Sequence, residues 1–415
     1  MMNRSPTLSP PAPSTAHPFR TPQSELRGRL HEARHRSGAP SLLAELLRER
    51  FERNPFDASW FHHPERDVAA WKAQTSALLA DALILPDAPG RPSQATLRRR
   101  EVFDDYVVEE VEITVTPPLR APATVVIPRN GERRHPAIVA LHSMGGHRLF
   151  GREKLLAFTG EPASLSQYRE TYYEGRSLQA ELARAGFLSI AIDAIHFGLR
   201  TEAALRDPAA FQEWRLRSTP AEAAEQAAAV GRLESPIDHR LLECVGLSTA
   251  ALVATDDLRT VDYLLERPDV DPSRIGATGL SFGSFRSHYL AALDPRIRAT
   301  VSVCWHSTLR GIIGYNEPGA MGFFALPPGL YRRLDLVDIT ALAAPRPFLA
   351  ISGWDDRLMQ PFGIAEAHLF LREAWEKAGA PENLGSLVYP APHVYNAAMQ
   401  EAALRFLREK LGGNS

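Results

Sequence analysis

The chain has 415 residues, of which 44% are hydrophobic and 23% charged, as is ordinary for a soluble globular protein of one large domain or two. Its net charge of −2 argues against nucleic acid or an anionic membrane as the main partner. Its two cysteines, Cys244 and Cys304, provide neither a disulfide framework nor a Cys/His metal motif, so we expect a reduced, cytoplasmic setting and no metal site.

The N-terminal part predicts a tail followed by helices. Residues 1–23 are rich in Pro, Ser and Thr and lack the apolar segment of a secretory signal, which indicates a disordered tail. Residues 24–92 carry apolar side chains at three- and four-residue spacing and end in a linker from residue 86. We expect a helical extension that acts as a lid or as an interaction module, for example in a homodimer. No apolar run reaches the roughly 18–20 residues of a membrane span.

From residue 100 to residue 415 the pattern changes to strands that alternate with helices. Residues 106–116 and 123–127 predict two early antiparallel strands, because β-branched residues alternate there. Later strands are almost continuously apolar, as expected for parallel strands covered on both faces. They are predicted at 137–141, 188–192, 275–278, 299–303, 348–351 and 387–389. Helices are predicted at 178–185, 241–265, 282–293, 364–378 and 397–411. This order predicts an α/β fold with a doubly wound, mostly parallel sheet.

One connection within this domain is unusually long. Residues 201–234 are rich in Ala, Glu and Arg and show helical patterning. A stretch of this length is too long for a simple connection between a strand and a helix. We therefore expect an inserted helical lid at about residues 197–240.

Ser281 lies at the predicted corner between a strand and a helix, in Gly279-Leu280-Ser281-Phe282-Gly283. A nucleophile at such a corner needs small residues two positions before and after it, because a β-carbon there would clash with the backbone. The N-terminus of the following helix also favours developing negative charge. The pentapeptide alone is a weak signal, and a plain glycine turn is the alternative. The context of strand, turn and helix favours a nucleophile.

An acid and a histidine follow later predicted strands. A serine hydroxyl is a weak nucleophile until a histidine takes its proton and an acid orients that histidine. Asp356 follows the strand at 348–351, and His393 follows the strand at 387–389, so both lie at strand ends in the expected chain order. Asp355 is the alternative acid. Either acid could instead cap the next helix, and His393 could be a surface loop histidine.

An oxyanion hole needs two backbone N–H groups aimed at the developing negative oxygen. We expect one from Phe282 and the other from Met144, with Ser143 as the second choice, because the loop at 141–146 follows the first parallel strand and contains small residues. Polar and aromatic side chains at other strand ends are expected to line the substrate pocket rather than to catalyse. These candidates are His142, Ser143, His147, His196, Trp305 and His306.

The stretch from about Pro136 to the C-terminus resembles the α/β-hydrolase superfamily, and within it the branch of dienelactone hydrolases and acetyl-xylan esterases. The matching segments are 141–146, 256–264 with 270–276, 290–297 and 344–347. The resemblance implies an eight-stranded core, a Ser-Asp-His triad and no cofactor. Carried over by position, the triad falls on Ser281, Asp356 and His393.

Two departures from this family pattern affect the substrate more than the fold. Ser143 stands where the family usually has Gly, and the helical extension and the insertion resemble members with a helical lid, some of which cleave C–C bonds. We predict a serine hydrolase that cleaves small-molecule carboxylic esters through an acyl-enzyme, with no nucleic-acid or membrane partner. The alternatives are amide, thioester, lactone or C–C bond hydrolysis by the same triad, or a non-catalytic binding protein on this fold.

Overall fold

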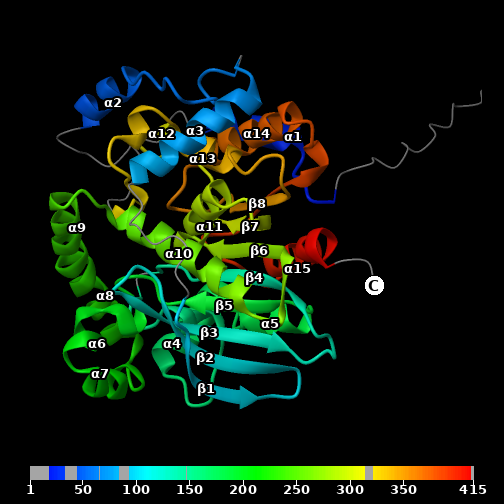
Figure 1. The fold of residues 1–415 in the computed structure, drawn as a ribbon. Coiled ribbons are helices and arrows are strands. Elements are labelled where there is room, and N and C mark those ends of the chain that lie inside the picture. Colours follow the sequence, from blue (N-terminus) through cyan, green and yellow to red (C-terminus); the bar gives the residue numbers. More distant parts are fainter. Residues whose placement is uncertain are drawn as a thin grey trace, which may run out of the picture.

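The computed structural model describes most of the chain (Figure 1). The described residues are 18–32, 44–64, 66–83, 93–145, 147–313 and 321–412. The predictions of a disordered tail at residues 1–17 and of a linker at residues 86–92 lie outside them. Within the described part, no helix is both long and apolar enough to cross a membrane.

A sheet of nine strands forms the centre of the described structure, in the order β1-β2-β3-β5-β4-β6-β7-β8-β9. The three pairs that join β1, β2, β3 and β5 are antiparallel, and the remaining pairs are parallel. The predicted α/β fold with a mostly parallel sheet is thereby confirmed. The strands are β1 Thr96–Val102, β2 Tyr106–Thr114, β3 Arg120–Pro128, β4 His135–Leu141, β5 Leu188–Ile192, β6 Val270–Leu280, β7 Ile297–Val303, β8 Phe348–Gly353 and β9 Leu384–Tyr389.

Strand β1 is an addition to the eight strands implied by the family resemblance. Its side chains are exposed or half-buried, so it lacks the alternation of apolar residues by which a strand is recognised. Backbone pairing with β2 holds it at the sheet edge, and Arg100 forms an ion pair with Glu109 of β2 at 3.4 Å. Charged side chains on an edge strand also discourage pairing with another chain.

Helices cover both faces of the sheet. Helices α10, α11 and α14 pack on one face, and α5 and α15 pack on the other. The helices are α1 Gln23–Glu32, α2 Ala44–Glu52, α3 Val68–Leu83, α4 Ala163–Tyr173, α5 Leu178–Arg184, α6 Glu202–Arg206, α7 Pro208–Arg215, α8 Pro220–Arg232, α9 Glu234–Cys244, α10 Thr249–Glu266, α11 Phe282–Leu293, α12 Leu309–Ile312, α13 Leu336–Ala341, α14 Pro361–Lys377 and α15 Ala397–Leu411. Short 3-10 turns are η1 Arg152–Leu155, η2 Gly198–Arg200, η3 Phe323–Ala325, η4 Leu330–Arg332 and η5 Pro381–Asn383.

The prediction of a single helix at 241–265 is wrong, because the structure has two helices there. The structure ends α9 at Cys244 and begins α10 at Thr249. Gly246 adopts φ +77° in the break, a conformation that glycine adopts without strain. The hydroxyl of Ser248 then caps α10 by accepting the N–H of Ala251 at 3.1 Å. Apolar periodicity continues across the break, which explains why the pattern indicated one helix.

The N-terminal extension packs against the sheet end formed by β8 and β9. Residues 18–22, which we assigned to the tail, instead lie along β9: the Thr21 N–H donates to the Ser386 carbonyl at 2.8 Å. Helix α1 packs on α14, and α3 packs on α11. Trp60 and Trp71 of the extension are buried in the same apolar cluster as α11, α13 and α14. In the described residues, the extension is therefore part of the hydrophobic core.

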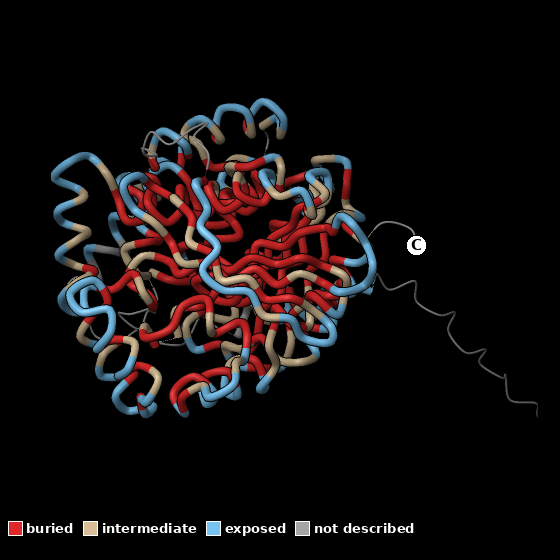
Figure 2. The backbone as a smooth tube through the Cα atoms, turned by 60° about the horizontal axis from the view of Figure 1, so that its bottom comes forward, coloured by how far each residue is buried: buried red, intermediate tan, exposed pale blue. Residues whose placement is uncertain are grey.

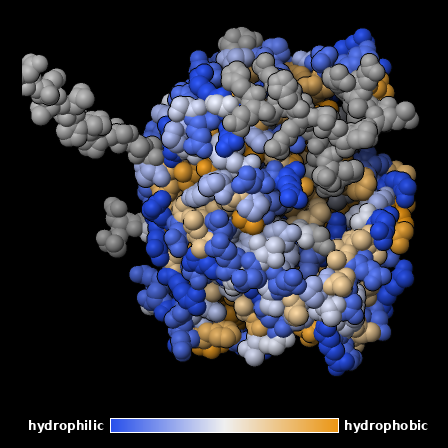
Figure 3. Space-filling model, turned by 180° about the vertical axis from the view of Figure 1, so that it is seen from behind, coloured by the Kyte–Doolittle hydropathy of each residue, from blue (hydrophilic) through white to orange (hydrophobic). Residues whose placement is uncertain are grey.

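The long connection between β5 and β6 is helical, as expected, and contains α6 to α9 before α10. These helices gather at one side of the molecule, beside the C-terminal ends of β4 and β5 (Figure 1). The centre of the sheet is buried, whereas the helices at the periphery alternate between buried and exposed residues (Figure 2). Hydrophilic residues dominate the face seen in Figure 3, where apolar residues form small separate groups.

Candidate active site

Ser281 occupies the corner between β6 and α11. Its backbone has φ +60° and ψ −116°, which non-glycine residues rarely adopt. A β-carbon on Gly283 would lie 1.9 Å from the Leu141 carbonyl oxygen, and one on Gly279 would lie 2.5 Å from the Gly283 backbone. Both positions flanking the corner therefore require glycine, for the steric reason inferred from the sequence.

The surrounding backbone holds this corner in place. The N–H of Ser281 donates to the Val303 carbonyl at 2.8 Å, and its carbonyl accepts the N–H of Phe285 at 2.9 Å. Ser281 is 8% exposed, at the N-terminus of a helix of 12 residues. A helix N-terminus favours negative charge, so this position suits a reaction in which negative charge develops beside the Ser281 oxygen.

Asp356 and His393 are joined by a hydrogen bond. They lie in the loops after β8 and β9, and His393 Nδ1 is 2.6 Å from Asp356 Oδ2. The other carboxylate oxygen of Asp356 accepts the N–H of Leu358 at 2.9 Å. The Asp356 side chain is 1% exposed, whereas Asp355 is exposed and is not paired with His393. Of the two predicted acids, Asp356 has the geometry to orient the imidazole.

The second nitrogen of His393, Nε2, is buried and has no hydrogen-bond partner in the described residues. A histidine that donates Nδ1–H to a carboxylate presents Nε2 as a proton acceptor. This arrangement leaves Nε2 available to a hydroxyl group, which is the requirement for a general base.

Cys304 was not predicted at the site but lies beside this pair. One donor atom each from Cys304, Asp356 and His393 falls within 4.8 Å of the others. Burial raises the pKa of the Cys304 thiol well above its usual value, which favours the neutral thiol. The Asp356–His393 hydrogen bond uses His393 Nδ1 and Asp356 Oδ2, whereas His393 Nε2 stays without a partner in the described residues. This hydrogen bond gives the pair the arrangement that proton transfer requires.

The loop after β4 is fixed by a buried lysine that the sequence analysis missed. The Lys154 ammonium is fully buried and donates to the carbonyls of Ser143 at 2.9 Å, Met144 at 2.9 Å and His147 at 2.5 Å. The N–H groups of Met144 and Phe282 donate to no acceptor in the part of the chain that the structure describes. They are free to bind an oxygen of a ligand.

A pocket of about 550 Å³ adjoins this loop and the serine corner. Met144 and Phe282, the two residues predicted to supply the oxyanion donors, both line it, whereas Ser281, Asp356 and His393 do not. Helices α8 and α9 of the insertion close one side, through Ala227 and Ser235 among others. The full lining is Met144, Arg148, Ile195, His196, Phe197, Ala224, Ala227, Ala228, Gly231, Ser235, Pro236, Thr249, Val253, Phe282, Met321, Gly322, Phe323 and Phe324.

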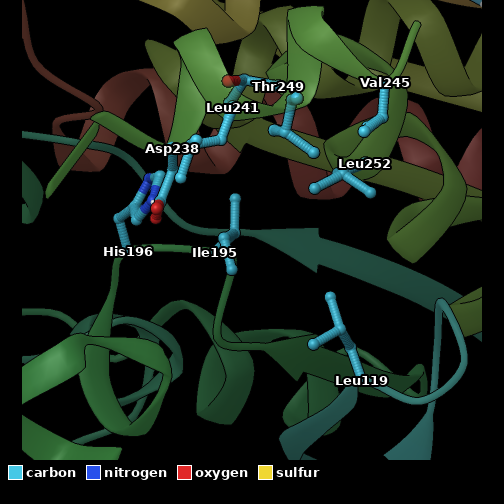
Figure 4. Close-up of a pocket in the computed structure, with 9 residues that line it drawn as sticks. Leu119, Ile195, His196, Asp238, Leu241, Val245, Thr249 and Leu252 are labelled. Carbon is cyan, nitrogen blue, oxygen red and sulfur yellow. Dashed lines mark hydrogen bonds and ion pairs between the residues drawn. The ribbon is translucent and has the colours of Figure 1, made fainter. Parts of the chain in front are cut away.

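A smaller pocket of about 340 Å³ shares Ile195, His196 and Thr249 with the larger one (Figure 4). His196 Nε2 is 2.7 Å from an Asp238 carboxylate oxygen, and its Nδ1 is 3.1 Å from the Ser235 hydroxyl. Both partners belong to α9. His196, which follows β5, therefore ties the insertion to the end of the sheet.

The other predicted pocket residues are buried and do not line the larger pocket, so their role in substrate binding stays a prediction. His142 Nε2 accepts the N–H of Ala194 at 3.1 Å, and Ser143 bonds to the Tyr168 hydroxyl. His306 lies within 3.3 Å of the Ser352 hydroxyl, and burial lowers its pKa to about 3. Since strand ends can turn their side chains inward, position alone did not distinguish wall from interior.

His147 and Trp305 are also absent from the pocket lining. His147 packs between the rings of Phe150 and Tyr168, and burial lowers its pKa to about 3. Trp305 packs against Phe324, which does line the pocket. Of the six candidates, only His196 reaches the pocket directly.

Comparison with known proteins shows which proteins this chain resembles. No family model matches the chain. The protein named "Putative hydrolase YtaP" of Bacillus subtilis (strain 168) is 28% identical over 340 residues, which cover 82% of this chain and 98% of that protein. The structure of a putative acetyl xylan esterase from Bacteroides fragilis NCTC 9343 matches with a TM-score of 0.58 and 18% identity, over 84% of this chain and 81% of that one.

The chain has the α/β-hydrolase fold. A glucuronoyl esterase from Solibacter usitatus also shares this fold, with a TM-score of 0.54 and 14% identity, over 83% of this chain and 94% of that one. At these identities the structural matches establish the α/β-hydrolase architecture alone. In an open α/β sheet, sites form at the carboxyl ends of the strands, where the serine corner, the Asp356–His393 pair and the pocket all lie.

Proposed function

We propose that the protein is a serine hydrolase that cleaves carboxylic esters through an acyl-enzyme, with Ser281, Asp356 and His393 as its triad. The observation that carries this proposal is the buried Asp356–His393 hydrogen bond, which leaves Nε2 of the histidine without a partner. The glycine-flanked corner that holds Ser281 supplies the matching nucleophile position. Two similar structures carry the names of esterases, which favours an ester over other acyl bonds.

In the proposed reaction, His393 Nε2 takes the proton of the Ser281 hydroxyl as its oxygen attacks the ester carbonyl. Asp356 holds the imidazole in the tautomer with hydrogen on Nδ1 and stabilises the imidazolium that forms. The imidazolium then returns its proton to the leaving alcohol, and an acyl-enzyme remains. Water attacks the acyl-enzyme by the same route and releases the acid.

The negative oxygen of each tetrahedral intermediate would be bound by the N–H groups of Met144 and Phe282. Both donors are free in the described structure and both line the pocket. Loss of one oxyanion donor typically costs about 10²- to 10³-fold in kcat. Helices α8 and α9, which close the pocket, would act as the lid that shields this site from water.

The test is a comparison of 4-nitrophenyl esters with matched 4-nitroanilides, using wild type and Ser281→Ala. We expect ester hydrolysis that falls by at least about 10³-fold in kcat in the variant. Faster turnover of the anilides would identify an amide hydrolase. Equal ester turnover by both proteins would contradict the role of Ser281.

A further inference from the structure

Arg148 differs from the paired arginines near the site, because no Asp or Glu among the described residues forms an ion pair with it. It follows the oxyanion loop and lines the 550 Å³ pocket. Its guanidinium lies over the Phe197 ring at 4.8 Å, and one nitrogen is 3.7 Å from the Met144 sulfur. Neighbouring buried arginines are each paired with a carboxylate. These pairs are Arg152–Asp193, Arg200–Asp256, Arg215–Glu153 and Arg286–Asp257.

Arg148 makes no ion pair within the described residues, although the charge of Glu234 acts on it. Glu234 instead accepts the N–H of Glu202 at 3.3 Å. Burial lowers the pKa of Arg148 to about 10 and the Glu234 charge opposes this effect, so the partly buried guanidinium stays charged at neutral pH. A partly buried cation that has no direct ion pair in the described residues would be stabilised by an anion bound beside it.

Within the described residues, the lining of this pocket offers no competing anion. It contains no Asp or Glu there, whereas Asp238 lines the smaller pocket. Most of the wall is apolar, with polar groups from His196, Ser235 and Thr249. The pocket therefore suits a ligand with an apolar body and an anionic end.

Arg148 is also connected to the reacting centre. The Phe197 ring beneath its guanidinium stacks on Phe282, with ring centroids 5.6 Å apart. Phe282 directly follows Ser281, and Met144, whose sulfur contacts Arg148, belongs to the oxyanion loop. An anion on Arg148 would therefore bind in the pocket that Met144 and Phe282 also line.

We propose that this pocket selects esters that carry a second, free carboxylate, and that Arg148 binds this carboxylate. The proposal rests on the proposed ester hydrolysis at Ser281. An arginine binds a carboxylate with two parallel N–H···O bonds, which fixes the direction of the ligand as well as its charge. Arg148 would be a specificity-determining residue, because it discriminates acidic esters from neutral ones of the same size.

The experiment compares two pairs of esters that differ only in a carboxylate. For the acyl side, the pair is the mono-4-nitrophenyl ester of adipic acid and 4-nitrophenyl hexanoate. For the alcohol side, the pair is 4-acetoxybenzoate and 4-acetoxytoluene. We expect wild type to prefer the acidic member of one pair. In Arg148→Met, kcat/KM for that acidic ester should fall by about 10- to 100-fold, while the neutral ester changes by less than about 3-fold.

Arg232→Met is the matched control, because this exposed arginine lies on α8 outside the pocket lining and its removal changes the net charge equally. It should leave the preference unchanged. Equal losses on acidic and neutral esters in Arg148→Met, or no acidic preference in wild type on either pair, would overturn the proposal. Hydrolysis of the neutral esters that depends on Ser281 would show that the ester hydrolase survives such a result. Absence of all turnover would instead count against the proposed function itself.

Discussion

Asp355 and Asp356 are adjacent in sequence but occupy different environments. Asp356 is buried and bonded to His393, whereas Asp355 points to solvent and makes a backbone bond to the Ala391 carbonyl at 3.1 Å. The two residues therefore form a matched pair of substitution sites. Their side chains have the same chemistry, and only one can orient the imidazole.

Asp356→Asn should lower kcat by about 10³- to 10⁴-fold, because an amide that donates to Nδ1 fixes the wrong tautomer of His393. Asp355→Asn should change kcat by less than about 3-fold, as for a surface substitution. Steady-state kinetics on a 4-nitrophenyl ester measures both. Similar losses in the two variants would contradict the assignment of the acid.

The nucleophile, acid and histidine could be proposed from the sequence because each follows a strongly apolar strand. Ser281 is also flanked by Gly279 and Gly283, which are required because a β-carbon at either position would clash with the backbone. Arg148 and Lys154 could not be proposed, because their functions depend on where side chains point after the chain folds. The proposed role of Arg148 depends on its making no ion pair in the described residues, and no pattern along the chain encodes a missing contact.

At the level of elements, the loop between β4 and η1 is organised by a single side chain. The three protons of the Lys154 ammonium match three carbonyl acceptors, so the charged form fits the loop. Burial lowers the pKa of Lys154 well below its usual value, and the charges of Asp193 and Glu153 oppose this effect. The loop geometry therefore depends on a lysine that lies outside the pocket lining.

Lys154→Met should release this loop and misalign the Met144 N–H. We expect the free energy of unfolding to fall by about 3 kcal/mol, since three buried carbonyls lose their donor. In the folded variant, kcat should fall by about 10- to 100-fold with little change in KM, because the oxyanion forms only in the transition state. Urea unfolding and steady-state kinetics test this. A folded variant with wild-type kcat would contradict the positioning role.

Most elements could be predicted where apolar periodicity was strong, as in α11 and α15, whose predicted and observed bounds agree. Strand β1 could not be predicted, because it is held by backbone pairing and ion pairs and has no buried apolar face. The break between α9 and α10 depends on Gly246 at positive φ, a local signal hidden within continuous apolar spacing.

At the scale of the whole molecule, the insertion lies beside the pocket, whereas the N-terminal extension packs into the core. The insertion lines the pocket through α8 and α9, which supports a lid. The extension buries Trp60 and Trp71 against the helices beside β8. The backbone N–H of Trp60 also donates to an Asp338 carboxylate oxygen at 2.9 Å. We therefore propose that the extension completes the core rather than covering the pocket.

Buried histidines should make the fold sensitive to acid. His147 is buried and neither ring nitrogen has a partner in the described residues. Its folded pKa of about 3 lies below the unfolded value of about 6.5, so the unfolded chain binds a proton more readily. The stability contributed by neutral His147 is complete above about pH 6.5 and is lost as the pH falls toward 3.

His147→Leu should weaken this dependence. Between pH 7 and pH 4.5, the loss in free energy of unfolding should be about 2–3 kcal/mol smaller in the variant than in wild type. Urea unfolding at several pH values measures this difference. If the free energy of unfolding depended on pH in the same way in both proteins, His147 would not titrate as a buried neutral group.

The central claim is that Ser281 is a nucleophile activated by His393, and a fluorophosphonate probe tests it most directly. Intact-mass and peptide mass spectrometry would measure the covalent adduct on wild type, Ser281→Ala and His393→Ala. We predict one adduct per wild-type chain, located on Ser281, with none on Ser281→Ala and labelling of His393→Ala slowed by at least about 10³-fold. Folded wild-type protein that forms no adduct, or an adduct on a different residue, would contradict the claim.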